Sequence, residues 1–577
     1  MGTLDGLTAH LPSALRDLPP LYIASTTLIA LALTIYLWLF YIAYARIPFR
    51  NLPDPGPGHW LLGHVPSFFA AASANSFHVD WHKAHGHTLK YRTQLGSYEV
   101  STIDPTAIAY ILNHPDMFDK PPAVRKWLQA RIGGYTIFAT SGDHHKQQRK
   151  ALGPSFTPAA IRDLVPVFYD VAYELKDKFH TLVAGKDKTK LAPSPPKPID
   201  AVPGGAKINV LKYLNMATLD SMGLTGFGYA FDSLSEDGNG QKNEFAESCR
   251  EFVAAATQLT MVDYVIEQYM FKIPSKRENF IKRKRQQILE FSTKLAEEKK
   301  HDIWEQTYGE GIAKKQDVGK DLLSLLIKAN IASDLTQDER LDDQDVADQI
   351  ETFASLILLA GSETTAVSVS TFLRLLSKHT DVQDRLRKEL MSVTEDRPSP
   401  ETLNNLPYLE AVTRECLRLA PAAPFVFRSA VEPVIIPLGT PMIGKDGQLM
   451  TEFTMDTASQ IFLPVLAINT STTLWGPDAE TFNPDRFLDR FAGVNPKIPG
   501  IYGNLLTFLG GPRNCIGYRF AIQQIKIMLF VLLRSHEFRE LKSGPEALMK
   551  MSPAVQHFIK GEEHLGAQIP LMVVPLE

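Results

Sequence analysis

The sequence predicts a mainly α-helical fold with small β-sheets, an α+β fold class, preceded by one transmembrane helix. An uncharged apolar run of 25 residues covers positions 21–45. Residues 89–102 alternate between apolar and polar side chains about Gly96, which indicates a β-hairpin. Apolar residues recur at the three- and four-residue spacing of helices in five further segments, residues 160–185, 211–224, 282–299, 344–378 and 518–534.

The run at 21–45 is long enough to anchor the chain in a membrane. At about 1.5 Å per residue, a helix of this length spans the roughly 30 Å hydrocarbon core with some tilt. A cleaved secretory signal is the alternative, but its apolar core is shorter and follows a positive segment. Because Arg46 and Arg50 follow the run, we expect residues 1–20 in the lumen and the remaining chain in the cytosol.

Proline and glycine crowd residues 46–58, so we expect a stiff, non-helical hinge there. From residue 59 to residue 577 no shift in composition marks another boundary. We therefore expect a single large domain after the hinge, although the length alone would allow a split.

Composition excludes several classes of function. The net charge is only −4 over 577 residues and no long basic run occurs, which argues against nucleic acid as a partner. The three cysteines, Cys249, Cys416 and Cys515, form no Cys-x-x-Cys pair, so neither a zinc ribbon nor a dithiol motif is supported. Hydrolase, phosphate-loop, nicotinamide and flavin fingerprints are also missing, so an oxidoreductase of this sequence would receive its electrons from a separate protein.

The most specific chemistry is predicted at residues 508–517, a glycine-rich loop that places Cys515 just before an apolar helical run. Gly510, Gly511 and Gly517 allow close backbone approaches, so something bulky and flat could lie against the turn. Arg513 could pair with an anionic group of such a ligand. Backbone N–H groups at the helix start favour the thiolate form of the cysteine.

The spacing Phe508-x-x-Gly511-x-Arg513-x-Cys515-x-Gly517 resembles the haem-binding signature of the cytochrome P-450 family at every position. An isolated cysteine at a tight turn is usually a buried free thiol, and only the complete match favours an iron ligand. The resemblance implies that the Cys515 thiolate is the axial ligand of haem b and that the other four residues surround the cofactor. The hinge resembles the proline-rich segment of microsomal members of the family.

A polar cluster, residues 360–365, interrupts the apolar helix expected over 352–376. Its hydroxyls could simply bond back to carbonyls one turn earlier. However, glycine costs roughly 1 kcal/mol in a helix interior, and a buried acid needs a partner or loses its charge. The cluster resembles the family's oxygen-activation motif, which implies that Gly361 leaves room beside the haem, that Thr364 bonds dioxygen and that Glu363 relays protons.

Glu415 and Arg418 lie three residues apart and therefore share one helix face. Such a pair is common and weak when it is exposed. Together with Arg486 in the segment Phe-Asn-Pro-Asp-Arg-Phe, it resembles the family's Glu-x-x-Arg network. The resemblance implies a buried structural network rather than a catalytic one.

Haem carries two propionates, so further cations are expected. Arg149 matches the arginine of the family's Trp-x-x-x-Arg helix, and His145 stands where the motif usually has tryptophan. Arg428 lies ten residues after Arg418, as a propionate-binding arginine of the family often does. A metal site at His144 and His145 is not expected, because adjacent helical side chains point in different directions.

Taken together, the resemblance implies a haem-thiolate monooxygenase of the microsomal, fungal-like secondary-metabolism type. The implied partners are O2, a lipophilic substrate, NADPH-cytochrome P-450 reductase and, as an option left open, cytochrome b5. The expected location is the endoplasmic reticulum membrane, crossed once, with the catalytic domain in the cytosol. Ile137, Phe138 and residues 423–426 are apolar and are expected to face a terpenoid, sterol, fatty acid or aromatic secondary metabolite.

Two alternatives remain at this point. A haem-thiolate isomerase or dehydratase would use the iron without dioxygen, although such relatives often lack the threonine found here at Thr364. A membrane-anchored haem-binding protein without turnover is the other alternative.

Overall fold

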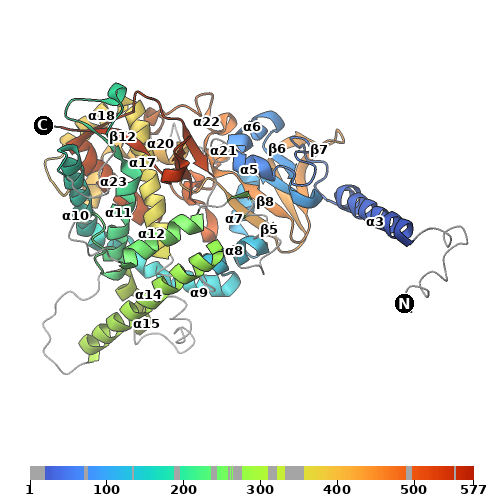
Figure 1. The fold of residues 1–577 in the computed structure, drawn as a ribbon, viewed down its shortest axis with the longest axis horizontal. Coiled ribbons are helices and arrows are strands. Elements are labelled where there is room, and N and C mark those ends of the chain that lie inside the picture. Colours follow the sequence, from blue (N-terminus) through green and yellow to red (C-terminus); the bar gives the residue numbers. More distant parts are fainter. Residues whose placement is uncertain are drawn as a thin grey trace, which may run out of the picture.

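The computed structural model describes residues 20–576, apart from 71–75, 133–135, 187–194, 236–243, 258–259, 262, 264–275, 309–320, 332–355, 489–496 and 551–553. A helical part and a β-rich part make up the body, and helix α3 (Pro20–Leu37) projects from the β-rich side (Figure 1). The predicted class, mainly helical with small sheets, is confirmed.

The α-helices of the body are α5 (Val65–Ala70), α6 (Ser76–His85), α7 (Pro105–Asn113), α8 (Pro122–Ile132), α9 (Gly142–Leu152), α10 (Pro158–Val183), α11 (Val210–Met222), α12 (Glu244–Thr257), α14 (Lys276–Tyr308), α15 (Leu322–Ile331), α17 (Thr364–Lys378), α18 (Thr380–Met391), α19 (Pro400–Asn404), α20 (Pro407–Leu419), α21 (Val465–Asn469), α22 (Thr472–Trp475) and α23 (Tyr518–Ser535). The periodic segments predicted as helices correspond to α10, α11, α14, α17 and α23. The part of the fourth segment before residue 356 lies outside the described residues.

Helices α10, α11, α17 and α23 pack together in the helical part of the body (Figure 1). Helix α10 begins at an N-cap, where the Thr157 hydroxyl accepts a hydrogen bond from Ala160 N at 3.3 Å and Pro158 takes the first helical position. Nearly all of α23 after Phe520 is buried. This packing positions the site, because α17 follows the polar cluster and α23 follows the cysteine loop.

The sheets are small. One has five strands in the order β1-β2-β8-β5-β3, and another has three in the order β4-β12-β9. Two hairpins, β6–β7 and β10–β11, complete the β structure of the described residues. The strands are β1 (Thr88–Arg92), β2 (Tyr98–Thr102), β3 (Phe118–Asp119), β4 (Ala206–Asn209), β5 (Val426–Ala430), β6 (Val434–Ile443), β7 (Leu449–Met455), β8 (Gln460–Leu463), β9 (His536–Arg539), β10 (Ala547–Lys550), β11 (Gln556–Ile559) and β12 (Pro570–Pro575).

The predicted hairpin at 89–102 is confirmed as the antiparallel pair β1–β2. Its turn contains Gly96, whose φ of 75° lies in the left-handed region. A Cβ at Gly96 would meet the carbonyl oxygen of Leu39 at 2.5 Å. The turn therefore packs directly on the end of the N-terminal helix.

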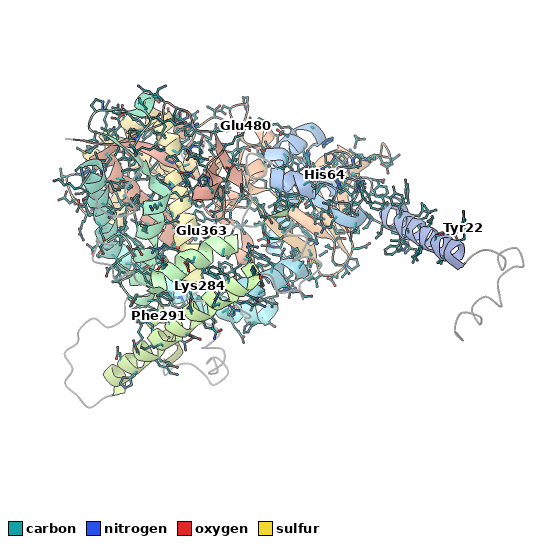
Figure 2. All side chains as sticks on the ribbon, viewed as in Figure 1. Tyr22, His64, Lys284, Phe291, Glu363 and Glu480 are labelled. Atoms are coloured by element: carbon teal, nitrogen blue, oxygen red, sulfur yellow. The ribbon has the colours of Figure 1, made fainter. Side chains whose placement is uncertain are left out.

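The N-terminal helix continues from α3 through the π-helix Trp38–Ile42 (η1) to α4 (Ala43–Ala45). Within it, Ala24–Ile42 is the one stretch of the described residues long and apolar enough to cross a membrane, and none of it is buried inside the protein. Figure 2 shows Tyr22 at the far end of this helix, away from the body. The predicted run at 21–45 thus forms a helix, while residues 1–19 of the expected lumenal segment lie outside the described residues.

Packing, hydrogen bonds and ion pairs hold the hinge, residues 46–58, against the domain. Phe49 and Leu52 are buried in the main core. The Lys90 ammonium on β1 donates to the Leu52 carbonyl and pairs with Asp54 at 3.2 Å. Asp54 also pairs with Lys445, beyond the end of β6. These contacts, rather than proline alone, hold the orientation of the domain relative to the helix.

Arg418 on α20 is the largest fully buried side chain among the described residues. Its Nε and Nη2 donate to the two oxygens of Glu415 at 2.7 Å each. Its Nη1 donates to the carbonyls of Asn469, at 2.8 Å, and Ala479. A buried ion pair is tolerated only when its remaining donors and acceptors are satisfied, as they are here.

The third expected member of this network, Arg486, lies beside the pair. Its Nε is 3.7 Å from Glu415 Oε2, and its Nη2 pairs with Asp478 at 2.7 Å. The N–H of Asn483 donates to Glu415 Oε1 at 2.8 Å. The structure therefore brings Glu415, Arg418 and Arg486 together.

The network extends to the cysteine loop through Asn469, a residue that the sequence did not suggest. The Asn469 amide donates to the Thr507 hydroxyl at 3.0 Å and accepts from Leu506 N at 3.3 Å. Residues Leu506–Phe508 form a short 3-10 helix, and the Phe508 carbonyl accepts from Cys515 N at 2.9 Å. The buried ion pair thus supports the loop that carries Cys515.

Replacing Glu415 with Ala should destabilise the fold by about 3–5 kcal/mol, because Arg418 would remain buried without its carboxylate. The measurement is denaturant unfolding of the detergent-solubilised protein, followed by circular dichroism. A matched control is Asp384→Ala, which removes a pair of the same i,i+3 spacing whose aspartate is 60% exposed. That change should cost about 1 kcal/mol or less. Equal losses for the two variants would contradict a special role of the buried pair.

Candidate functional site

The cysteine loop joins the 3-10 helices Leu506–Phe508 (η8) and Gly511–Arg513 (η9) and ends where α23 begins. Its backbone is held by hydrogen bonds from Cys515 N to the Phe508 carbonyl at 2.9 Å and from Asn514 N to the Gly511 carbonyl at 3.1 Å. Leu509 has a φ of 58°, an unusual value for a residue with a side chain. The loop is therefore a closed and locally strained turn.

Two glycines of the loop lie against the protein's own backbone. A Cβ at Gly510 would meet the Pro499 carbonyl oxygen at 1.8 Å, and one at Gly511 would meet the Leu112 carbonyl oxygen at 2.2 Å. Both glycines are thus required by close contact with the protein's own backbone. At Gly517 an added Cβ would meet only a ring carbon of Phe156, at 3.7 Å.

The Cys515 thiol lies within the fold but is not covered. Burial raises the pKa of the thiol, whereas a hydrogen bond from Gly517 N–H and the charge of Arg149 lower it. The side chain is nevertheless exposed. The thiol is therefore close to many protein atoms and is still accessible to a ligand.

Arg149 on α9 supports the loop next to this thiol. Its Nη1 donates to the Asn514 carbonyl at 2.8 Å and its Nη2 to the Asn514 side-chain oxygen at 2.5 Å. The guanidinium is therefore held one residue before Cys515. Its positive charge there favours the thiolate.

Several cations gather beside the loop around the carboxylate of Asp119 on β3, and Asp116 adds a second negative charge near Arg513. Arg513 Nη2 is 3.4 Å from Asp119, and Arg125 Nη2 is 3.0 Å from it. Arg428 on β5, the strand paired with β3, is buried, and its Nη1 donates to a neighbouring carbonyl at 2.8 Å. Lys120 directly follows Asp119. Positive side chains therefore outnumber negative ones around Asp119.

Burial and this excess of positive charge lower the pKa values of basic residues beside the loop. Burial, with Arg428 and Arg513, lowers the pKa of Lys120 to about 7. Burial and then Arg513 lower the pKa of Arg428 to about 10. Burial, together with Arg513, Lys120 and Arg149, lowers the pKa of His145 to about 3. The positive charges of this cluster therefore repel one another.

These residues match what a bound haem needs. The Nε–H of Arg513 is buried without a hydrogen-bond partner among the described residues. Two propionates would supply that partner and offset the excess charge. No group of three or more His, Cys, Asp and Glu residues that could hold a metal ion occurs within the part of the chain that the structure describes. An iron at Cys515 would thus need ligands from a cofactor.

The polar cluster lies where a π-helix, Leu356–Glu363 (η6), passes into α17. The sequence suggested one regular helix, and no residue preference marked the wider π turn, a feature that is frequent at functional sites. The Thr364 hydroxyl donates to the Ala360 carbonyl at 2.5 Å, and the Ser368 hydroxyl donates to the Thr364 carbonyl at 2.8 Å. In this structure the hydroxyls therefore bond back along the helix.

Gly361 is close-packed. A Cβ there would meet the Met222 side chain of α11 at 2.5 Å. The space beside Gly361 is thus filled by a flexible methionine, which can adapt its conformation more readily than a branched side chain.

Glu363 is 6% exposed and is therefore buried, and its label in Figure 2 falls within the outline of the body. Burial raises the pKa of this carboxyl to about 8, although a hydrogen bond from Gln556 opposes the shift. No cation forms an ion pair with Glu363 among the described residues. The carboxyl therefore keeps its proton at neutral pH.

The apolar segments expected to face a substrate are only partly described. Ile137 is buried, and Phe425 stacks on Phe462 with ring centroids 5.3 Å apart. Phe425 thus contacts a small aromatic core cluster. The side chains that precede Ala360 on the π-helix lie outside the described residues.

Sequence reasoning missed Lys120, Asn469 and Gln556. None belongs to a spaced motif, and each reaches the site only through the tertiary fold. The proximity of Asp119 and Lys120 to Arg428 follows from the pairing of β3 with β5.

Comparison with known proteins agrees with this geometry. A family model described as Cytochrome P450 matches residues 53–560. "Cytochrome P450 monooxygenase 205" of Postia placenta is 36% identical over 552 residues, which cover 94% of this chain and 96% of that protein. "Ganoderic acid synthetase CYP5150L8" of Ganoderma lucidum is 30% identical over 549 residues, covering 90% and 94%. "Cytochrome P450 monooxygenase claP" of Ampulloclitocybe clavipes is 30% identical over 564 residues, covering 96% and 98%.

The family model covers most of the chain, and these fungal relatives match it almost from end to end. The family predicted from residues 508–517 is confirmed, and so is the enzyme class. The chain therefore belongs to the cytochrome P450 family and is a monooxygenase of that family.

Proposed function

We propose that this monooxygenase inserts one oxygen atom of O2 into a lipophilic small molecule, with electrons that NADPH supplies through a reductase. One observation carries the proposal. The Cys515 thiol is exposed, and the loop that carries it also carries Arg513, one of a cluster of cations with Arg125, Arg428 and Lys120 that outnumbers the nearby carboxylates. A dianionic, iron-bearing cofactor accounts for both features.

The cofactor is haem b, and the chain would hold it on two sides. Cys515 would provide the thiolate ligand, which Arg149 favours through its contact with Asn514. Phe508 and Gly517 would border the ring near the thiolate, and Gly511 would keep the loop closed. Arg513, Arg428, His145 and Lys120 are the groups that would anchor the propionates.

When bound, the haem supplies the activation of dioxygen. The chain supplies orientation and protons. Glu363, protonated at neutral pH, would release a proton toward the site, and the Thr364 hydroxyl, now bonded to Ala360, would rotate to donate there. Gly361 and Met222 would set the space between this helix and α11.

For the substrate we propose a lipophilic secondary metabolite. The support is the apolar character of the segments at 137–138 and 423–426, together with the relative named ganoderic acid synthetase. Terpenoids, sterols, fatty acids and aromatic metabolites share that character.

We further propose that residues 21–45 anchor the chain in the endoplasmic reticulum membrane, with residues 46–58 as hinge and the domain at 59–577 in the cytosol. Support comes from the exposed apolar helix and the positive residues after it. There the domain would meet NADPH-cytochrome P-450 reductase, and cytochrome b5 is a second candidate donor.

Replacing Cys515 with Ala should abolish the red-shifted band in the reduced carbon monoxide difference spectrum, because that band reports a thiolate on the iron. Cys249→Ala is the matched control, since Cys249 is a buried cysteine on α12. It should leave the band in place. A red-shifted band in the Cys515 variant would exclude this residue as the ligand.

Replacing Lys120 with Met should speed haem loss to an excess of an apo-globin acceptor by roughly tenfold, the size expected for one charge-assisted hydrogen bond. Lys126→Met on α8 removes an exposed lysine six residues away and serves as control. Equal rates for the two variants would show that Lys120 does not anchor the cofactor.

Coupling of NADPH use to product should fall as pH rises through about 8, because Glu363 carries its proton only below its raised pKa. The assay measures peroxide and product with a compound selected by its spectral shift.

Glu363→Gln should give roughly tenfold less product per NADPH at pH 7 and should remove this pH dependence. Thr364→Ala should release more peroxide at every pH. Unchanged coupling in both variants would contradict the assigned roles.

A further inference from the structure

Glu363 has one hydrogen-bond partner for its carboxyl among the described residues, and that partner comes from the far end of the chain. The Gln556 amide donates to Glu363 Oε1 in a short hydrogen bond. The two residues lie 193 positions apart, on η6 and β11. Both are buried, at 6% and 8% exposed. The acid is therefore held by the C-terminal hairpin.

Gln556 is itself fixed by contacts that do not involve Glu363. It pairs with Lys550 across the β10–β11 hairpin. The preceding residue, Val555, donates its N–H to the Ala422 carbonyl at 2.9 Å, in the loop after α20. The strand thus remains in place if the Gln556 side chain is shortened or made apolar.

His557 gives the hairpin a second contact with the same helix. Its Nε2 lies 3.3 Å from the Thr371 hydroxyl on α17, eight residues after Glu363 and therefore about two turns along. Burial, with Arg374, lowers the pKa of His557 to about 4. This neighbour is neutral at physiological pH and adds no charge near the acid.

The chemistry of an amide suits an acid that must give up a proton and regain it. A lysine or arginine at position 556 would hold Glu363 as the anion, and an apolar residue would hold it as the neutral acid. A glutamine amide can donate to either form, and its oxygen can also accept from the protonated carboxyl. Both protonation states of Glu363 are thus compatible with the same partner.

We propose that Gln556 is a positioning residue for proton delivery, which holds the Glu363 carboxyl in place through both its protonated and its ionised state. The only bond that changes in this step is the Glu363 O–H bond, which breaks as the proton leaves for the site and forms again with a proton from solvent. Gln556 itself exchanges no proton. The inference rests on the function proposed above for Glu363, and it adds the C-terminal hairpin to the residues that control proton supply.

The test uses the full-length holoprotein in lipid nanodiscs with its reductase. Gln556→Leu removes the amide at nearly constant volume, and Gln556→Asn shortens it. The matched control is Gln568→Leu, because the Gln568 side chain donates to Glu562 at 3.1 Å and so forms the same kind of Gln–Glu bond with a different glutamate. Its backbone N–H, which donates to the His557 carbonyl at 2.8 Å, is unchanged by this substitution. All variants are first checked for haem content and for the red-shifted carbon monoxide band.

The direct readout is the infrared C=O stretch of the protonated Glu363 carboxyl, identified by its loss in Glu363→Gln and titrated with pH. In Gln556→Leu the band should move to higher frequency, because the carbonyl loses its donor, and should persist to higher pH, because the bond that lowers the pKa of Glu363 is gone. Gln568→Leu should leave the band unchanged. An unchanged band in Gln556→Leu would overturn the proposal.

The functional readout is product per NADPH and the solvent deuterium isotope effect on NADPH oxidation. Gln556→Leu should lose roughly tenfold in coupling and show a larger isotope effect, and Gln556→Asn should recover part of the loss. If Glu363→Gln uncouples the enzyme but Gln556→Leu does not, the role of Gln556 is rejected and the proposed function stands. If Glu363→Gln has no effect on coupling, the role of Glu363 in the proposed function fails, and this inference fails with it.

Discussion

The fold around the site depends on the requirement that the buried charge of Arg418 be fully satisfied. An unpaired guanidinium in the core would cost several kcal/mol, so every segment that it touches is constrained. Glu415 binds two of its nitrogens, and the carbonyls of Asn469 and Ala479 accept from a third. Through the Asn469 side chain the constraint reaches Leu506 and the turn before Cys515. The thiol is therefore positioned by an ion pair that never contacts it.

Burial has opposite results at the two parts of the candidate site. Beside the cysteine loop it concentrates cations around Asp119, and their mutual repulsion favours an anionic ligand. At the start of α17 it isolates Glu363 from any cation among the described residues, and the carboxyl keeps its proton. The first part suits an anionic ligand, and the second holds a protonated carboxyl, the two properties on which the proposed function rests. Both properties arise from the loss of water around ionisable groups.

Local motifs were predictable because their residues lie close together in the chain. The turn before α23, the helical segments and the apolar run at 21–45 each depend on neighbours within a few positions, and periodicity or spacing reveals them. The contacts of the loop glycines with the rest of the protein were not predictable. Gly510 and Gly511 make room for Pro499 and Leu112, contacts that no local pattern encodes. The π turn before Thr364 was missed because no residue preference marks it.

The sequence by itself predicted the family, which the comparisons confirm, and the apolar run that forms the N-terminal helix. It also identified Cys515, Glu363 and Thr364 as candidate site residues. Only the tertiary structure decided which groups surround them. Lys120 joins Arg428 because β3 pairs with β5, and Gln556 reaches Glu363 across 193 residues because the C-terminal hairpin packs on α17. Such contacts depend on strand pairing and helix packing between segments far apart in the chain. Spacing along the sequence carries no information about them.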